Sequence, residues 1–410
     1  MSKELSFNSL VLLSLISFGI FGSLSHVFNS VLIFALTLSY FNSKTKSFIN
    51  PSAKKLYFAI SSVFFIFLIR GVFHTDTLAS IESLSPMLPI PLIGLMILLT
   101  NRDNFSISAT RLENYAKIAV ITTFLIYLIF SKSLALKFGV TELFFDRLEI
   151  FSGNPIPFST AVFGITVFCF CNWKHSKNHD KLIAIACLLI GCWLAGIASG
   201  ARGTLLVIVI STPIFIWLMT QSFLLLLLMP VFILAFFWLL HINGVVIINN
   251  SYSYRLISGL DTFFNNGTSS TSVLLRLEMQ SASLNTIKEN LFWGYDISNR
   301  FTALSEHLPE AFKKHTHPHN DILASTIGAG LIGGLLSILS LLSPVWAALI
   351  SKENTKEKLI LAILVTLGIL ITANLNTVFF NDITAAWLAF STFLIWNLTF
   401  LKREEQTSTI

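Results

Sequence analysis

The chain has 410 residues, of which 54% are hydrophobic and 12% are charged, and its net charge is +6. A soluble domain usually carries about 25% charged residues. Together with a mean hydropathy of +0.75, this composition excludes a water-soluble globule, a disordered chain and a nucleic-acid-binding domain. The positive charge identifies no partner, because basic residues on cytoplasmic loops produce it in many membrane proteins. The sequence therefore predicts an all-α, polytopic integral membrane protein.

Apolar runs long enough to cross a bilayer recur along the chain. A membrane helix needs about 20 apolar residues, or fewer when tilt or neighbouring helices compensate. On this measure the sequence predicts twelve spans, near residues 8–23, 25–41, 56–73, 86–100, 116–131, 155–173, 181–199, 203–220, 222–241, 320–344, 358–374 and 383–401. The first run lacks a small-residue cleavage signal after it, so we expect a retained span rather than a signal peptide.

Lysine and arginine are unevenly divided between the two sides of these spans. With a cytoplasmic N-terminus, 16 of the 27 basic residues lie on the cytoplasmic side and five lie on the outer side. The other six lie in a long loop and are left out of the comparison, because the charge rule applies to short loops. This distribution predicts that both termini are cytoplasmic. We expect spans one to nine in residues 1–241, an extracytoplasmic loop in 242–318, spans ten to twelve in 319–401, and a cytoplasmic tail in 402–410.

The long extracytoplasmic loop contains one segment with a helical apolar pattern. Five apolar residues recur there at helical spacing: Leu274, Leu277, Leu284, Ile287 and Leu291. The pattern predicts an amphipathic helix over 273–290 that lies on the membrane or on the helical bundle.

Four arginines are predicted on the extracytoplasmic side, against the usual bias: Arg70, Arg147, Arg202 and Arg276. The planar guanidinium suits phosphate and diphosphate oxygens. Two of these arginines also have a simpler explanation. Arg202 could be an interfacial arginine that closes a tight turn, and Arg276 could be an ordinary residue on the polar face of its helix.

Three alternating histidines, His315, His317 and His319, precede the tenth predicted span. A histidine at this position can accept a proton from a hydroxyl group, because its ordinary pKa lies near neutrality. Two alternatives stay open at this point: a histidine that caps the helix or bonds a loop carbonyl, and a metal site formed by the three imidazoles.

The spacing that follows the histidines is distinctive. His319 and Asn320 are followed after nine residues by Gly330 and, after two more, by Gly333. This pattern resembles the periplasmic signature of bacterial O-antigen ligases. The Ser-Gly-Ala-Arg-Gly-Thr segment at 199–204 resembles the arginine-bearing turn of the wider O-antigen ligase and polymerase superfamily.

The resemblance implies a GT-C type glycosyltransferase architecture in the bacterial inner membrane, with a large periplasmic loop and a site that faces the periplasm. It implies transfer of O-antigen from undecaprenyl diphosphate to a sugar hydroxyl of lipid A-core. The transfer would invert the configuration of the anomeric carbon and would need no metal or cofactor. The expected partners are these two substrates and membrane lipids, and no nucleic acid. Association with other lipopolysaccharide-assembly proteins stays open.

The resemblance also assigns roles to individual residues. His319 is expected to be the catalytic base. The residues expected to bind the diphosphate are Arg202 and Arg276, with help from Arg147 or Arg70. The expected supporting residues are Asn320, His317, Gly330 and Gly333.

Two other functions remain open. An O-antigen polymerase would use the same donor on a similar fold. A lipid-glycan transporter would also suit twelve spans, but it should have charges or broken helices near the membrane midplane.

Overall fold

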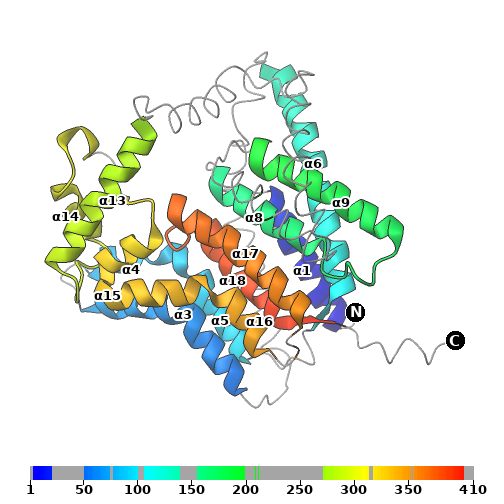
Figure 1. Ribbon diagram of the computed structural model, residues 1–410, viewed down its shortest axis with the longest axis horizontal. Coiled ribbons are helices and arrows are strands. Elements are labelled where there is room, and N and C mark those ends of the chain that lie inside the picture. Colours follow the sequence, from blue (N-terminus) through cyan, green and yellow to red (C-terminus); the bar gives the residue numbers. More distant parts are fainter. Residues whose placement is uncertain are drawn as a thin grey trace.

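The computed structural model describes residues 3–20, 50–73, 77–99, 106–138, 155–198, 208, 211, 271–313, 317–351, 353 and 355–400. The described chain is helical apart from one short pair of strands (Figure 1). The helices before the gap at residue 212 are α1 (Lys3–Ile20), α3 (Pro51–Val72), α4 (Thr77–Glu82), η1 (Ser85–Met87), α5 (Pro89–Leu99), α6 (Ala109–Phe138), α8 (Pro155–Phe168), α9 (Asn178–Cys192) and the π-helix η3 (Trp193–Ala198). The later helices are α13 (Thr271–Glu289), α14 (Arg300–Glu306), η4 (Glu310–Phe312), α15 (Asp321–Leu341), α16 (Ser343–Ile350), α17 (Lys356–Leu375) and α18 (Asp382–Asn397).

The described helices agree in position with nine of the predicted spans, namely those matched by α1, α3, α5, α6, α8, α9, α15, α17 and α18. The predicted spans near 25–41 and 222–241, and nearly all of 203–220, lie outside the described residues. Four helices, 51–72, 178–196, 321–341 and 356–375, are long and apolar enough to cross a membrane. A fifth span results if Thr77–Met87 and Pro89–Leu98, bent by 61°, are one unit. The total of twelve spans stays a prediction.

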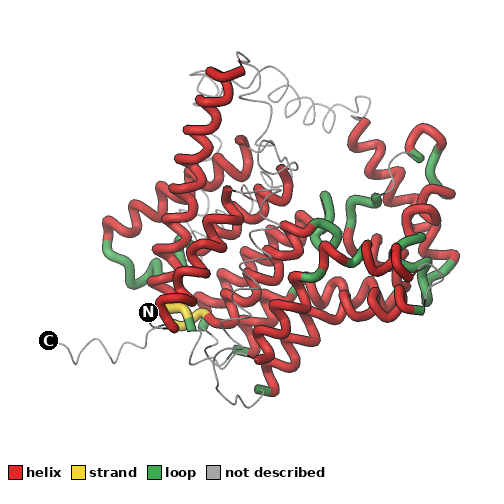
Figure 2. Tube along the Cα trace, turned by 180° about the vertical axis from the view of Figure 1, so that it is seen from behind, coloured by secondary structure: helices red, strands yellow, loops and turns green. Residues whose placement is uncertain are grey.

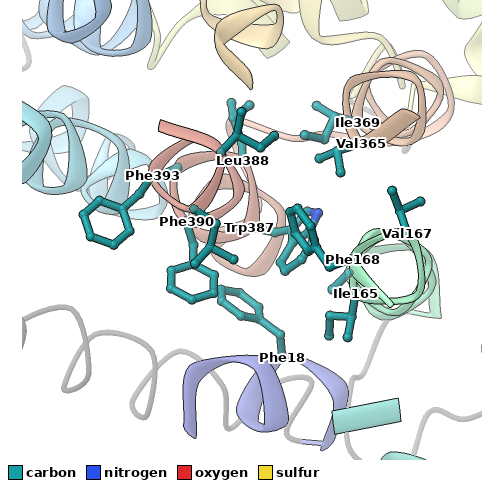
Figure 3. Close-up of a cluster of buried hydrophobic side chains, with 14 of the residues drawn as sticks. Phe18, Ile165, Val167, Phe168, Val365, Ile369, Trp387, Leu388, Phe390 and Phe393 are labelled. Carbon is teal, nitrogen blue, oxygen red and sulfur yellow. The ribbon is translucent and has the colours of Figure 1, made fainter. Parts of the chain in front are cut away.

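Helix α18 lies at the centre of the core. All its residues from Ile383 to Asn397 are buried, and it contacts α5, α8, α16 and α17. Its Trp387 ring packs edge-on against Phe18 of α1 at 5.2 Å and lies 6.3 Å from Phe168 of α8, measured between centroids (Figure 3). Gly164 of α8 makes room for the indole, since a Cβ there would lie 2.3 Å from Trp387 Cζ2. A helix this apolar on every side fits the centre of a bundle.

Helices α17 and α18 separate two groups of helices. Helices α1, α6, α8 and α9 contact one another, while α3 contacts α5, α15 and α16. Figure 1 shows the first group on the right and the second at the lower left. Helices α4, α13 and α14 lie at one end of the second group, where α4 contacts α3 and where α13 and α14 contact α15.

The sequence sets several helix starts through side-chain caps. Asn50 accepts a hydrogen bond from the Ser52 N–H at 2.9 Å, and Pro51 occupies the first turn of α3. Thr355 and Asn381 cap α17 and α18 in the same way. Each cap pairs one of the N–H groups that a helix start leaves free.

The end of the bundle opposite α13 and α14 is closed by backbone pairing and buried charges. Strand β1 (Ile107–Ser108) pairs in parallel with β2 (Leu398–Thr399), as Figure 2 shows beside the N-terminus. Lys358, which is fully buried, donates to the Leu398 carbonyl at 2.8 Å. At this end Lys117 and Glu113 also form a buried ion pair at 2.5 Å.

Helix α15 is not the single straight helix predicted over 320–344, because it reverses direction at Ala329 and Gly330. Ala329 has φ −132° and ψ 23°, and Gly330 has φ 66° and ψ −164°. A Cβ on Gly333 would lie 2.4 Å from the Ser325 carbonyl oxygen. In a straight helix residues eight apart are separated by about 12 Å along the axis. The part before the reversal, 321–329, therefore packs against the part after it, and Gly330 and Gly333 permit the turn and the close approach.

The connection between α13 and α14, residues 290–299, fills this reversal. The N–H groups of Tyr295 and Asp296 donate to the carbonyls of Ile327 and Gly328 at 2.7 and 2.8 Å. The Leu331 N–H donates to the Leu291 carbonyl at 2.8 Å. Three of the backbone groups that the break removes from the helical ladder, the carbonyls of Ile327 and Gly328 and the N–H of Leu331, are thus paired, as burial demands.

Gly330→Ala should destabilise the protein. The left-handed backbone alone costs an alanine roughly 1–3 kcal/mol, and the new Cβ would lie 2.1 Å from the Phe292 carbonyl oxygen. Thermal unfolding in detergent measures the effect. Ile332→Ala is the control, because that side chain is 55% exposed on the same helix. Equal melting temperatures for Gly330→Ala and the wild type would show that the reversal does not need glycine.

Candidate active site

His319 lies in a short segment, residues 317–320, that leads into α15. Its backbone has φ 50°, a left-handed conformation that is uncommon for residues other than glycine. The His319 N–H donates to His317 Nδ1 at 3.0 Å. His315 lies outside the described residues, so the predicted alternative of a three-histidine metal site remains a prediction.

Asn320 anchors the segment to two helices. Its side-chain oxygen accepts from the Leu323 N–H at 3.0 Å and caps α15. Its side-chain nitrogen donates to Asn374 Oδ1 of α17 at 2.9 Å. Asn320 is thus a helix cap and a link between helices, and its predicted supporting role in catalysis stays a prediction.

The next residue, Asp321, fixes the connection between α17 and α18. Asp321 is fully buried, and its carboxylate accepts a hydrogen bond from the Val378 N–H. The same connection carries Phe380, whose ring lies 6.3 Å from the His317 ring, measured between centroids. Sequence reasoning gave Asp321 no role of its own, and only the folded structure brings residues 317–321 and 376–381 together.

A buried guanidinium lies beside the histidines. Arg300, in the first turn of α14, is 4% exposed. Its guanidinium carbon lies 3.6 Å from the centroid of the Phe380 ring and 4.4 Å from that of Phe301. Burial lowers the pKa of Arg300 to about 9, while the charges of Asp321 and Asp296 act in the opposite direction. No sequence pattern marked Arg300, because an arginine in a polar loop is usually solvated.

Asp296 holds α4 against the α13–α14 connection. Its Oδ2 accepts hydrogen bonds from the hydroxyl groups of Ser80 at 2.8 Å and Ser298 at 3.0 Å. Burial acts to raise the pKa of Asp296, but these hydrogen bonds, together with backbone N–H groups, hold it below its ordinary value. The carboxylate is therefore ionised and structural at neutral pH.

The structure describes two of the four predicted diphosphate-binding arginines. Arg70 is half-buried near the end of α3 and donates from Nη2 to the Gly294 carbonyl at 3.2 Å, where Asn290 Nδ2 also donates, at 2.7 Å. Arg70 therefore supports the loop that fills the α15 reversal. Arg147 and Arg202 lie outside the described residues, and their predicted roles stay predictions.

Arg276 is half-buried in α13. It lies one helical turn before Met279, which packs with Leu304 and Ile327 in a small apolar cluster. In the described part of the chain no carboxylate lies within ion-pair distance of Arg276, and burial lowers its pKa. A guanidinium that is partly desolvated and lacks a protein counter-charge is suited to bind an anion.

The predicted amphipathic helix over 273–290 is present as α13, and Ile287 of the predicted stripe packs with the apolar cluster around Met279. Leu277 and Leu284 of the predicted stripe are more than half exposed, at 57% and 51%. The buried face instead carries Met279, Ala282 and Ser283. Small side chains allow α13 to pack closely on α15 and α14, and the leucines are left on the outer surface.

No group of three or more His, Cys, Asp or Glu side chains that could hold a metal ion occurs within the described ranges. The polar groups that do gather at this end of the bundle are an imidazole pair, a buried guanidinium and the half-buried Arg276. Such a set can accept a proton and bind an anion.

The fold and the site define an apolar helical protein with a histidine and arginine site at one end of its bundle. Residues 185–338 match a family model described as O-antigen ligase. Comparison with curated proteins gives no match. The matched segment contains Arg202, Arg276, His319 and Gly330, and the match supports an enzymatic role in lipopolysaccharide biosynthesis.

Ser80→Ala should lower the stability of the site end of the bundle. Removal of one donor from the buried carboxylate of Asp296 is expected to cost about 1–3 kcal/mol at neutral pH. Because the Asp296 pKa lies below its ordinary value, this stabilisation is present above that value and is lost as the pH falls through the folded-state pKa. The melting temperatures of variant and wild type should therefore converge only as the pH falls below 3.8, the ordinary pKa of an aspartate. Ser83→Ala is the control, since its hydroxyl donates to the Ala79 carbonyl of its own helix.

Asn320→Ala and Asn320→Asp separate the two roles of Asn320. Alanine removes the cap of α15 and should cost about 1 kcal/mol, whereas aspartate keeps the cap and loses only the amide bond to Asn374. Chemical or thermal unfolding in detergent measures both variants. If aspartate proved as damaging as alanine, and Asn374→Ala matched them, the link between helices rather than the cap would be the important contact.

Proposed function

We propose that this protein transfers O-antigen polysaccharide from undecaprenyl diphosphate to a sugar hydroxyl of lipid A-core, at the periplasmic face of the bacterial inner membrane. The observation that carries the proposal is His319, held at one end of the bundle within the segment that matches the O-antigen ligase family. The predicted orientation, from the distribution of lysine and arginine, assigns this end to the periplasm.

In the proposed reaction the acceptor hydroxyl attacks the anomeric carbon of the donor. His319 accepts the hydroxyl proton, a contribution of about a hundred-fold or more. The new glycosidic bond forms as the bond to the diphosphate oxygen breaks, and undecaprenyl diphosphate leaves with the electron pair. Direct attack of this kind inverts the anomeric configuration.

The leaving diphosphate needs cationic donors. Arg276 supports this step because it is half-buried and has no carboxylate partner in the described segments. Stabilisation of developing charge by one such donor is worth about 3 kcal/mol. Arg202 is proposed as the second donor on its sequence context, with Arg147 or Arg70 as further candidates. Arg70 already donates to the Gly294 carbonyl, which favours a structural role for it.

The proposal is tested by deletion of the gene, followed by complementation. Deletion should leave bare lipid A-core together with long polymer on undecaprenyl diphosphate. His319→Ala should not restore ligation, and Arg276→Lys should restore it poorly, because lysine lacks the planar fork. His307→Ala is the control, because that histidine lies outside the His319 segment and pairs with Glu289 on the surface.

The outcomes distinguish the three functions. Core capped with a single repeat after deletion would indicate a polymerase instead, and an unchanged lipopolysaccharide ladder would return the transporter to consideration. Full ligation by correctly inserted His319→Ala protein would overturn the role of His319 as the base.

A further inference from the structure

Arg300 is a buried charge at the start of α14. Two of its three nitrogen atoms, Nε and Nη1, are buried and have no hydrogen-bond partner among the described residues. No carboxylate in the described ranges forms an ion pair with it, and its close contacts are the faces of Phe380 and Phe301. A buried charge that lacks a close ion pair costs several kcal/mol. The aromatic faces recover part of this cost, so a further role for the charge is expected.

His317 packs into the same cluster. Its ring lies 5.5 Å from the Phe301 ring and 5.7 Å from the His319 ring, measured between centroids. Because His317 Nδ1 accepts the His319 N–H at 3.0 Å, this nitrogen carries no proton, and the proton of the neutral ring is on Nε2. A doubly protonated His317 would lose this bond, since neither nitrogen could then accept.

The charges around His317 favour its neutral form. Arg300 faces it from α14 and His319 from its own segment, while the α17–α18 connection presents the uncharged ring of Phe380. Burial, then Arg300, then His319 lower the pKa of His317 to about 3. Asp321 and Asp296 act on Arg300, and they favour its charged form.

The bond from His319 to His317 holds an unfavourable backbone conformation. A residue other than glycine in the left-handed region stores roughly 1–3 kcal/mol and persists only when its surroundings hold it. The bond to His317 is one contact that holds His319, and the cap of α15 fixes the next residue, Asn320. A neutral His317 therefore helps to set the backbone conformation of His319.

We propose that Arg300 and His317 are positioning residues for His319. The buried guanidinium adds to the effect of burial in keeping His317 as a hydrogen-bond acceptor, and His317 in turn helps to hold the His319 backbone in the conformation from which its ring meets the acceptor hydroxyl. The catalytic part of this inference rests on the proposed function, whereas the arrangement of the three residues does not.

Nitrogen NMR of histidine-labelled protein in lipid nanodiscs tests the arrangement without any substrate. The His317 signals are assigned by their loss in His317→Gln. In the wild type, Nδ1 of His317 should stay unprotonated between pH 5 and 8. In Arg300→Gln the protonation midpoint of His317 should move upward, because a nearby positive charge is gone. Lys313→Gln is the matched control, since it removes a surface charge from the same region and should leave the titration unchanged.

Transfer kinetics then test the positioning role. At the acid end of the pH range Arg300→Gln should lower kcat about ten-fold or more, with little change in the KM of either substrate, because the acid limb of its pH profile should move to higher pH. Arg300→Lys should restore part of the activity because it keeps the charge. A protonated Nδ1 of wild-type His317 would overturn the proposed arrangement, even if Arg300→Gln failed to fold. Unchanged kinetics in a folded Arg300→Gln would overturn the positioning role, whereas absence of transfer by the wild type would count against the proposed function itself.

Discussion

The organisation of the site end depends on how one broken helix satisfies its backbone hydrogen bonds. At Ala329 and Gly330 helix α15 leaves the helical ladder, and residues 291–296 supply the missing partners. In an apolar surrounding, unpaired carbonyl and N–H groups would be costly. The pairing therefore holds the α13–α14 connection at one place. Helix α14, and with it Arg300, is positioned as a result.

The reversal also gives the glycines of the family-like pattern a physical meaning. Gly330 provides a left-handed turn, and Gly333 allows the two parts of α15 to approach. Nine residues separate Asn320, which caps the first part, from Gly330, which ends it. The spacing between the pair His319-Asn320 and the glycines is thus the length of one short helix. Close packing, rather than an open lipid groove, is the role that the described contacts support for these glycines.

Much of the fold could be predicted from the sequence, because apolar length is a direct signal of membrane helices. The helices of α3 and α17, for example, lie within a few residues of the ranges expected from 56–73 and 358–374. The reversal in α15 could not be predicted, since Gly330 lies in an uninterrupted apolar run and glycines are common in membrane helices. The contact that Ala282 and Ser283 of α13 make could not be predicted either, because small side chains do not stand out in an apolar pattern.

The candidate site was predictable only where residue type and spacing coincide. His319 and Asn320 stand out because they precede a helix and are followed by spaced glycines. Arg300 and Phe380 lie 80 residues apart in the sequence, and nothing local marks either of them. They meet because Asp321 holds the α17–α18 connection against the start of α15. Long-range packing of this kind carries no signal in a single sequence.

The parallel pairing of β1 with β2 has a consequence for biosynthesis. Ile107 pairs with Leu398, the first residue after α18, so the pairing joins two segments that leave the ribosome at very different times. Contacts with so large a sequence separation form late, after the intervening chain has been ordered. Helix α18, the most buried helix described, must therefore enter a bundle whose other members are already in the membrane. The β1–β2 pair can therefore form only after the chain through α18 has been made.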